Sequence, residues 1–244
     1  MTITAREVRY QAGGRTCHGS LMVDERRPEK RPGVVVFPEF WGINDYARSR
    51  ARMLAEQGYV ALAADVYGDG TLAKTSAEGG ALMMELRRDP DLSAARIRGA
   101  VDALASQPEV DDTRLSAIGY CLGGAMALGA ARLGLPLCAV ASFHGVLDST
   151  RRATPGGVHA KVLVCHAGAD AFISAESIAA FHQEMHDAGV DYEFVSYPGV
   201  RHAFTDLDAD IRARAFGLAL GYDARADRAS WAKLLTFLSR TLDA

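Results

Sequence analysis

Short runs of apolar residues recur along this chain, separated by segments with helical periodicity. The clearest runs are residues 34–37, 59–64, 137–142 and 161–165. A strand covered on both faces of a parallel sheet needs such a run, because its side chains are buried on either side. Between the runs, segments such as the one with Ile97, Val101 and Leu104 place apolar residues on one stripe of a helix. This alternation predicts an α/β fold with a mainly parallel central sheet and helices on both faces.

The two ends of the chain extend the same pattern. Residues 8–10 and 19–23 are expected to pair as antiparallel strands, and residues 192–197 are the last expected strand. No element is assigned to residues 205–224, and whether they cover a pocket is left open. The chain has 244 residues, of which 49% are hydrophobic, and it shows no internal repeat or linker. We therefore expect a single domain over residues 1–244.

Charge and cysteine content exclude several classes of protein. The net charge of −3 and the lack of a basic cluster give no reason to expect nucleic acid or a membrane surface as a partner. The first residues lack the apolar core of a signal peptide, and no segment reaches the roughly 20 apolar residues that span a bilayer. We expect a cytoplasmic protein. The four cysteines have no C-x-x-C spacing and predict no disulfide scaffold.

A glycine-flanked cysteine lies between an expected strand and an expected helix. Residues 119–123 read Gly-Tyr-Cys-Leu-Gly, and residues 124–131 form a run of small helix-forming residues. In such a turn the central residue adopts a strained conformation, and the glycines leave room where a Cβ would clash. The following helix N-terminus would favour a thiolate at Cys121 and an oxyanion beside the N–H of Leu122. The alternative is a buried cysteine in a glycine-rich junction.

Polar residues collect where the expected strands end, which is where reactive groups gather in such sheets. They are Glu39, Asp65, Cys121, His144, His166, Asp170 and His202. The order nucleophile, acid, histidine along the chain is the triad order of the α/β-hydrolase fold. Cys121, Asp170 and His202 are therefore the candidate triad. Asp65 is interpreted as a structural carboxylate at a strand end.

Two histidine groups allow an alternative interpretation. His182 and His186 flank Glu184 at helical spacing, which fits either a weak metal site or, more simply, a solvated helix face. His144 and His166, together with residues of the candidate triad, could also hold a metal ion at the sheet edge. A metal site there would not explain the glycine-flanked turn at Cys121, so no metal and no cofactor is expected.

Several motifs together resemble the dienelactone hydrolase family over nearly the whole chain. They are residues 119–124, 37–42 and 64–68, the loop around Asp170, and residues 202–204. The resemblance implies that Cys121 is the nucleophile, that His202 is the base and that Asp170 orients the base. It also places Glu39 beside the resting thiol, where a carboxylate would disfavour the thiolate, and an oxyanion hole on the N–H groups of Leu122 and Phe40.

One departure from the family pattern bears on the substrate. Members that open dienelactone hold its carboxylate with arginines, one of them four residues after the histidine, and this chain has Asp206 at that position. Arg201 or Lys74 could substitute. Aromatic residues flank the candidate site and could line an apolar pocket, although some of them could be ordinary core residues instead. They are Phe40, Trp41, Tyr67, Phe143, Phe172 and Phe204. A small, uncharged substrate is therefore expected.

These observations predict a cofactor-independent hydrolase of small esters or lactones that acts through a Cys121 thioester. A lower-ranked activity of the same nucleophile is attack on activated phosphotriesters, because that transition state also develops oxyanion charge. A metal-dependent hydrolase and a non-catalytic binding protein on a hydrolase fold are the remaining alternatives. We expect a monomer or a homodimer whose partner is a small-molecule substrate.

Overall fold

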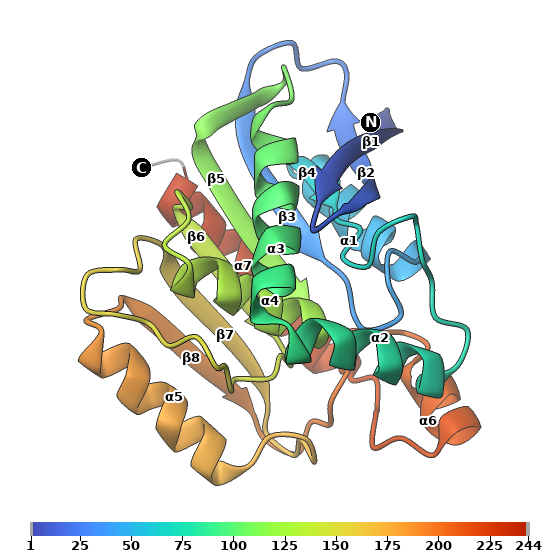
Figure 1. Ribbon diagram of the computed structural model, residues 1–244, viewed down its shortest axis with the longest axis vertical. Helices are drawn as coiled ribbons and strands as arrows, with labels where there is room; N and C mark the ends of the chain where they lie inside the picture. Colours follow the sequence, from blue (N-terminus) through green and yellow to red (C-terminus); the bar gives the residue numbers. More distant parts are fainter. Residues whose placement is uncertain (1, 243–244) are drawn as a thin grey trace.

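The structure, a computed structural model, describes residues 2–242 and is built on an eight-stranded sheet (Figure 1). The strands are β1 (Ile3–Ala12), β2 (Arg15–Asp24), β3 (Arg31–Phe37), β4 (Val60–Ala63), β5 (Val110–Tyr120), β6 (Ala139–Phe143), β7 (Lys161–Ala167) and β8 (Tyr192–Tyr197). Their order across the sheet is β1-β2-β4-β3-β5-β6-β7-β8. The pairs β1–β2 and β2–β4 are antiparallel and the others are parallel, which confirms the predicted sheet.

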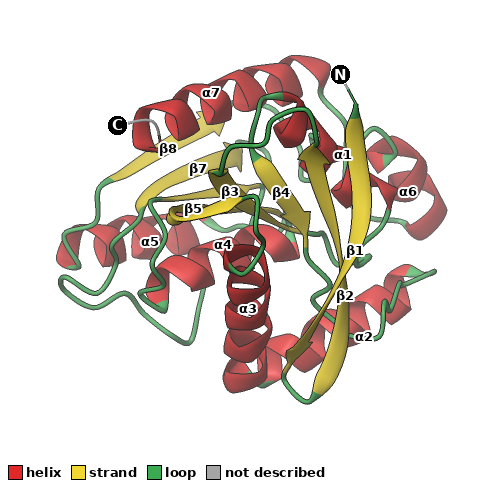
Figure 2. Cartoon of the chain, turned by 90° about the horizontal axis from the view of Figure 1, so that it is seen from above, coloured by secondary structure: helices red, strands yellow, loops and turns green. Residues whose placement is uncertain are grey.

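Helices cover both faces of this sheet. They are α1 (Asp45–Glu56), α2 (Ser76–Arg88), α3 (Pro90–Ala105), α4 (Leu122–Arg132), α5 (Ala175–Asp187), α6 (Ala209–Phe216) and α7 (Ala224–Leu242). Figure 2 shows α1 and α7 on one face and α3, α4 and α5 on the other. None of the helices within residues 2–242 is both long enough and apolar enough to cross a bilayer.

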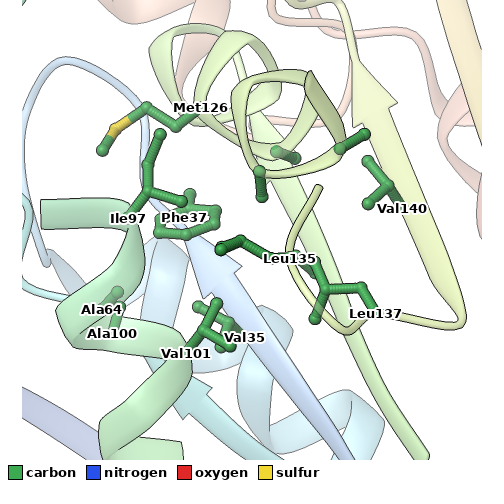
Figure 3. Close-up of a cluster of buried hydrophobic side chains, with 14 of the residues drawn as sticks. Val35, Phe37, Ala64, Ile97, Ala100, Val101, Met126, Leu135, Leu137 and Val140 are labelled. Carbon is green, nitrogen blue, oxygen red and sulfur yellow. The ribbon is translucent and has the colours of Figure 1, made fainter. Parts of the chain in front are cut away.

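Strand β3 explains why the apolar runs lack alternation. Val35 and Phe37 belong to the core cluster under α3 and α4, whereas Val34 and Val36 belong to the cluster under α1 and α7. Successive side chains of a strand point to opposite faces, so a strand between two helical layers must be apolar at every position. Figure 3 shows the first cluster, in which side chains of β3 lie beside those of α3 and α4.

Local signals in the sequence predicted most elements but not all. Asn44, a residue type favoured at helix N-termini, caps α1, because its side chain accepts a hydrogen bond from the Ala47 N–H at 3.1 Å. Helix α6 lies inside residues 205–224, for which the sequence analysis assigned no element. It is short, ends at Gly217 with φ 66°, and has only Ala209 fully buried, so its sequence carries little apolar periodicity.

Candidate active site

The backbone at Cys121 is strained in the way that its flanking glycines predict. Cys121 connects β5 to α4 with φ 53° and ψ −115°, a conformation that is rare for any residue other than glycine. A Cβ on Gly119 would lie 1.9 Å from the carbonyl oxygen of Gly123, and a Cβ on Gly123 would lie 2.1 Å from that of Phe37. Only glycine fits at these two positions, so the sharp turn requires both of them.

The turn presents Cys121 at the carboxyl edge of the sheet. Its thiol is free and its side chain is only partly buried. The sulfur lies at the start of α4, where the unpaired N–H groups and the helix dipole favour negative charge. A thiolate is therefore more favourable here than it would be within the apolar core.

His202 lies between Cys121 and Asp170. The Nδ1 atom of His202 is 2.7 Å from Oδ2 of Asp170, and their side chains are 5% and 0% exposed. The other oxygen, Oδ1, accepts a hydrogen bond from the Phe172 N–H at 2.9 Å, which orients the carboxylate. Burial alone would lower the pKa of His202. The neighbouring Cys121 sulfur and the Asp170 carboxylate have a larger, opposite effect, and together they raise the pKa of His202 to about 10.

A second histidine, His144, lies directly against His202. Its ring is buried and meets the His202 ring edge-on, with 5.1 Å between ring centroids. The Cys121 N–H points at Nδ1 of His144 at 3.2 Å, and Nε2 lies 2.8 Å from Oγ1 of Thr205. Burial lowers the pKa of His144 well below its usual value, and nearby His202 and Arg50 lower it further. The sequence analysis noted His144 at a strand end but did not predict its contacts with Cys121, Thr205 and His202.

Glu39 is buried in a cluster of charges near His202. Its carboxylate is 3.6 Å from Nη1 of Arg212, which also pairs with Asp206, and its Oε1 has no hydrogen-bond partner among the described residues. Burial and, to a smaller extent, Asp206 raise the pKa of Glu39 to about 8, against the opposing effects of Arg212, His202 and Arg50. Its expected position beside the thiol stays a prediction.

The raised pKa of Glu39 predicts how stability depends on pH. The unfolded value for a glutamate is about 4.3, so between roughly pH 4 and 8 the folded state binds more protons than the unfolded state. Stability due to this group is therefore present at low pH and lost as the pH rises through 8. We expect Glu39→Gln to melt about 4–8 °C above the wild type at pH 9, for a gain of about 2 kcal/mol.

At pH 5 the gain from Glu39→Gln should be much smaller, because the carboxyl is then protonated in the folded state and the pH is only just above the ordinary pKa of about 4.3 in the unfolded state. Calorimetry of both proteins at pH 5 and pH 9 measures the difference. The matched control is Glu56→Gln, which changes an exposed glutamate at the end of α1. Equal melting temperatures at pH 9 would contradict the assigned environment of Glu39.

Helix α6 packs over this charged cluster. The Arg212 guanidinium lies 5.1 Å from the Trp41 ring, and the Phe216 ring lies 5.5 Å from the same ring. Residues 205–224 therefore contact the loop that carries Glu39 and cover Trp41, which is 6% exposed. Asp206, which stands where the family pattern has an arginine, is buried and paired with Arg212.

The remaining aromatic residues named in the sequence analysis differ in exposure. Phe172 is 51% exposed and its ring lies 5.0 Å from that of His202, so it borders the site. Phe143 and Phe204 are fully buried and belong to the core beneath it. Tyr67 is also buried, and its hydroxyl donates to the Phe40 carbonyl at 3.0 Å, which steadies the segment that carries the Phe40 N–H.

Arg201 lies on the surface and is paired with a residue of α6. Its side chain is 53% exposed and pairs with Asp210 at 3.1 Å.

A cavity of about 370 Å³ lies between α2, α3 and α4, with a wall formed partly by Leu122. Its other lining residues are Met83, Leu86, Arg87, Pro90, Ser93, Ala94, Ile97, Ala125, Met126, Gly129, Leu133, Val146, Asp148, Ser149, Thr150 and Arg151. None of the aromatic residues named in the sequence analysis lines it.

The histidine groups considered as metal sites are separated in the structure. Glu184 is buried and pairs with Arg132 at 2.8 Å, so this face of α5 is not simply solvated as the sequence suggested. His182 instead contacts the Tyr192 hydroxyl at 2.9 Å, and the side chain of His186 is 84% exposed. Within residues 2–242, no group of three or more histidine, cysteine or acidic residues is arranged to hold a metal ion.

Asp65 has the structural role that its position at a strand end predicted. Its carboxylate accepts hydrogen bonds from the backbone N–H groups of His18, Tyr67, Gly68 and Gly70 at 2.8 to 3.1 Å. These bonds hold the loop after β4 against β2. The carboxylate is saturated by the backbone and has no part in the candidate site.

Comparison with known proteins relates the chain to a family of hydrolases. The model of the dienelactone hydrolase family matches residues 19–242. A putative carboxymethylenebutenolidase of Yersinia pestis is 28% identical over 86% of this chain and 78% of its own length. A probable 2-oxo-3-(5-oxofuran-2-ylidene)propanoate lactonase of Bradyrhizobium sp is 29% identical over 85% of this chain and 83% of its own.

Solved structures agree with this relationship. The crystal structure of P91, described as a dienelactone hydrolase-like promiscuous phosphotriesterase from metagenomic libraries, is 37% identical and covers 99% of both chains with a TM-score of 0.91. More distant α/β hydrolases share the fold alone, such as MGS-M1 from a deep-sea metagenome at 16% identity and a TM-score of 0.71.

Proposed function

Because the chain belongs to the dienelactone hydrolase family, whose members named above act on lactone or ester bonds, we propose that it hydrolyses small esters or lactones through a Cys121 thioester. The observation that carries the proposal is the position of His202, whose Nδ1 is hydrogen-bonded to Asp170 and whose pKa is raised by the neighbouring Cys121 sulfur. Such a relay turns a weak nucleophile into a reactive one at neutral pH.

The first half of the reaction forms the thioester. His202 takes the proton of the Cys121 thiol, and the sulfur attacks the carbonyl carbon, whose π electrons move to the oxygen. When the tetrahedral intermediate collapses, the C–O bond to the leaving group breaks and the leaving alkoxide takes the proton back from His202. Asp170 keeps Nδ1 protonated and stabilises the imidazolium between these two steps.

The second half releases the acid and restores the thiol. Water gives a proton to His202 and attacks the thioester. The C–S bond then breaks, and the leaving Cys121 thiolate takes the proton back from His202. Both halves develop negative charge on the carbonyl oxygen. The proposed donors to it are the N–H groups of Leu122, the first residue of α4, and Phe40, each contributing about 3 kcal/mol to the transition state.

The charges around the site favour an uncharged substrate. Glu39, Asp206 and Asp208 all face Arg212, so this cation is already surrounded by carboxylates. A substrate carboxylate in this cluster would compete with these three acidic side chains for the one guanidinium. Arg201 is also largely exposed and already paired with Asp210. A neutral ester or lactone meets neither obstacle.

The proposal is tested with a panel of neutral and carboxylated esters and lactones. We expect neutral p-nitrophenyl esters and small lactones to be turned over, and rapid quenching followed by mass spectrometry to find the acyl group on the peptide that contains Cys121. Iodoacetamide should abolish the activity and a chelator should leave it intact. Activity that survives iodoacetamide and is lost with the chelator would support the metal-dependent alternative instead.

A second candidate reaction is hydrolysis of activated phosphotriesters by the same groups. The 37% identity to P91, described as a promiscuous phosphotriesterase, favours it over other side activities. Attack of the Cys121 sulfur on phosphorus would also place negative charge on an oxygen near the Leu122 N–H. Diethyl p-nitrophenyl phosphate is the direct probe. If this candidate is right, the wild type releases p-nitrophenol from it and Cys121→Ala does not.

A further inference from the structure

A hydrogen-bonded link joins the cysteine turn to the loop that carries His202. It runs from the Cys121 N–H to Nδ1 of His144 at 3.2 Å, from Nε2 of His144 to Oγ1 of Thr205 at 2.8 Å, and from Thr205 to the Tyr46 hydroxyl at 2.6 Å. Cys121 follows β5, His144 follows β6, and Thr205 lies on the loop after β8, three residues beyond His202. The link therefore bridges separate parts of the site.

We propose that His144 is a positioning residue that, through Thr205, fixes the distance and angle between the Cys121 sulfur and the His202 ring. The inference rests on the proposed function, because the pair it positions is the proposed nucleophile and base. In the proposed reaction His144 is neither the nucleophile nor the base. It acts on the backbone of the nucleophile at one end and on the histidine loop at the other.

The hydrogen bonds determine the tautomer of His144. A backbone N–H can only donate, so Nδ1 must carry a lone pair, and the proton of a neutral ring is then on Nε2. Nε2 donates to Oγ1 of Thr205, which has lone pairs to accept it. This is the only neutral form that satisfies both contacts. The Cys121 N–H is shared between two acceptors, because it also donates to the Phe143 carbonyl at 3.0 Å.

The surroundings of His144 oppose its movement. Its backbone has φ 39°, a region that histidine and asparagine tolerate better than most residues do. The ring is also wedged between aromatic rings, with centroids 5.1 Å from His202 and 5.2 Å from Phe204. Thr205 is buried too, and its carbonyl accepts a hydrogen bond from Arg50, which pairs with Asp227 at 2.8 Å. Both ends of the link are therefore rigid.

A change at Thr205 tests the link without altering the proposed triad. Thr205→Val keeps the shape of the side chain and removes the hydroxyl that holds His144. We expect alkylation of Cys121 by iodoacetamide at pH 7 to slow about tenfold, and kcat for a neutral ester to fall about tenfold with KM changed less than twofold.

The matched control is Thr205→Ser, which keeps the hydroxyl and should stay within about twofold of the wild type in both measurements. A general loss of stability would lower the melting temperature of Thr205→Val but would leave the alkylation rate of the folded protein unchanged. If Thr205→Val does not fold, His144→Asn replaces it, since asparagine suits the backbone but cannot reach Thr205. We expect the same tenfold loss from that variant.

Wild-type alkylation rates in folded Thr205→Val or His144→Asn would overturn the inference. The alkylation measurement needs no substrate, so it separates this inference from the proposed function. If the wild type hydrolyses no ester but Thr205→Val still slows alkylation, the positioning role stands and the proposed reaction fails. If the wild type hydrolyses esters and the variants match it in both measurements, the proposed reaction stands and the link has no role in it.

Discussion

Cys121→Ala is expected to lower kcat/KM for a neutral p-nitrophenyl ester by at least about 10⁴-fold, because it removes the only nucleophile in the proposed mechanism. The residual rate would come from the oxyanion donors and from substrate binding. Alanine is smaller than cysteine and adds no new polar group to the turn. Stopped-flow and steady-state assays of the purified variant measure the loss, with the melting temperature as a check on folding.

The control for this change is Cys138→Ala, which removes another partly exposed free thiol, at the opposite end of the sheet where β6 begins. It should keep wild-type activity and its sensitivity to iodoacetamide. Mass spectrometry should find no acyl adduct on Cys121→Ala, whereas Cys138→Ala should form one. Ester hydrolysis within tenfold of the wild type in Cys121→Ala would contradict the covalent mechanism.

Asp170→Asn is expected to cost about 10⁴ in kcat/KM, the size of loss seen for the equivalent change in the serine-protease example. The asparagine amide would donate to Nδ1 of His202, and the ring proton would move to Nε2, which faces Cys121. His202 could then no longer accept the thiol proton. The loss of the carboxylate should also lower the pKa of His202, which the wild type holds at about 10.

The matched control is Asp148→Asn, which changes an exposed aspartate that accepts a hydrogen bond from Ser177 at 2.9 Å. It should keep wild-type activity. The pH dependence of Cys121 alkylation should change in Asp170→Asn and remain unchanged in Asp148→Asn. An activity loss of less than tenfold in Asp170→Asn would show that His202 does not depend on this carboxylate.

The residues of the candidate triad were predictable because each carries a local signal. Glycines on both sides of Cys121 predicted a strained turn, and the structure has φ 53° there. Asp170 and His202 each follow a strand of a parallel sheet, and the carboxyl ends of such strands meet at one edge. The order nucleophile, acid, histidine along the chain then matched the triad of the α/β-hydrolase fold. The structure places Asp170 and His202 2.7 Å apart.

The charged and hydrogen-bonded surroundings of the triad were not predictable in this way. Arg212 comes from a helix whose sequence has little periodicity, and its partner Glu39 lies on a distant loop. His144 and Thr205 are 61 residues apart and form one hydrogen bond. No spacing or composition links these residues, since their contacts depend on how the loops above the sheet pack together.

The sequence by itself determined the strands, the sharp turn at Cys121 and the edge of the sheet at which the reactive groups gather. Each of these follows from steric and hydrophobic preferences among residues that are close along the chain. Only the tertiary structure decided which charges surround Glu39, that α6 covers Trp41, and that His144 connects the cysteine turn to the His202 loop. These depend on strand order and loop packing, which bring together side chains that no local pattern relates.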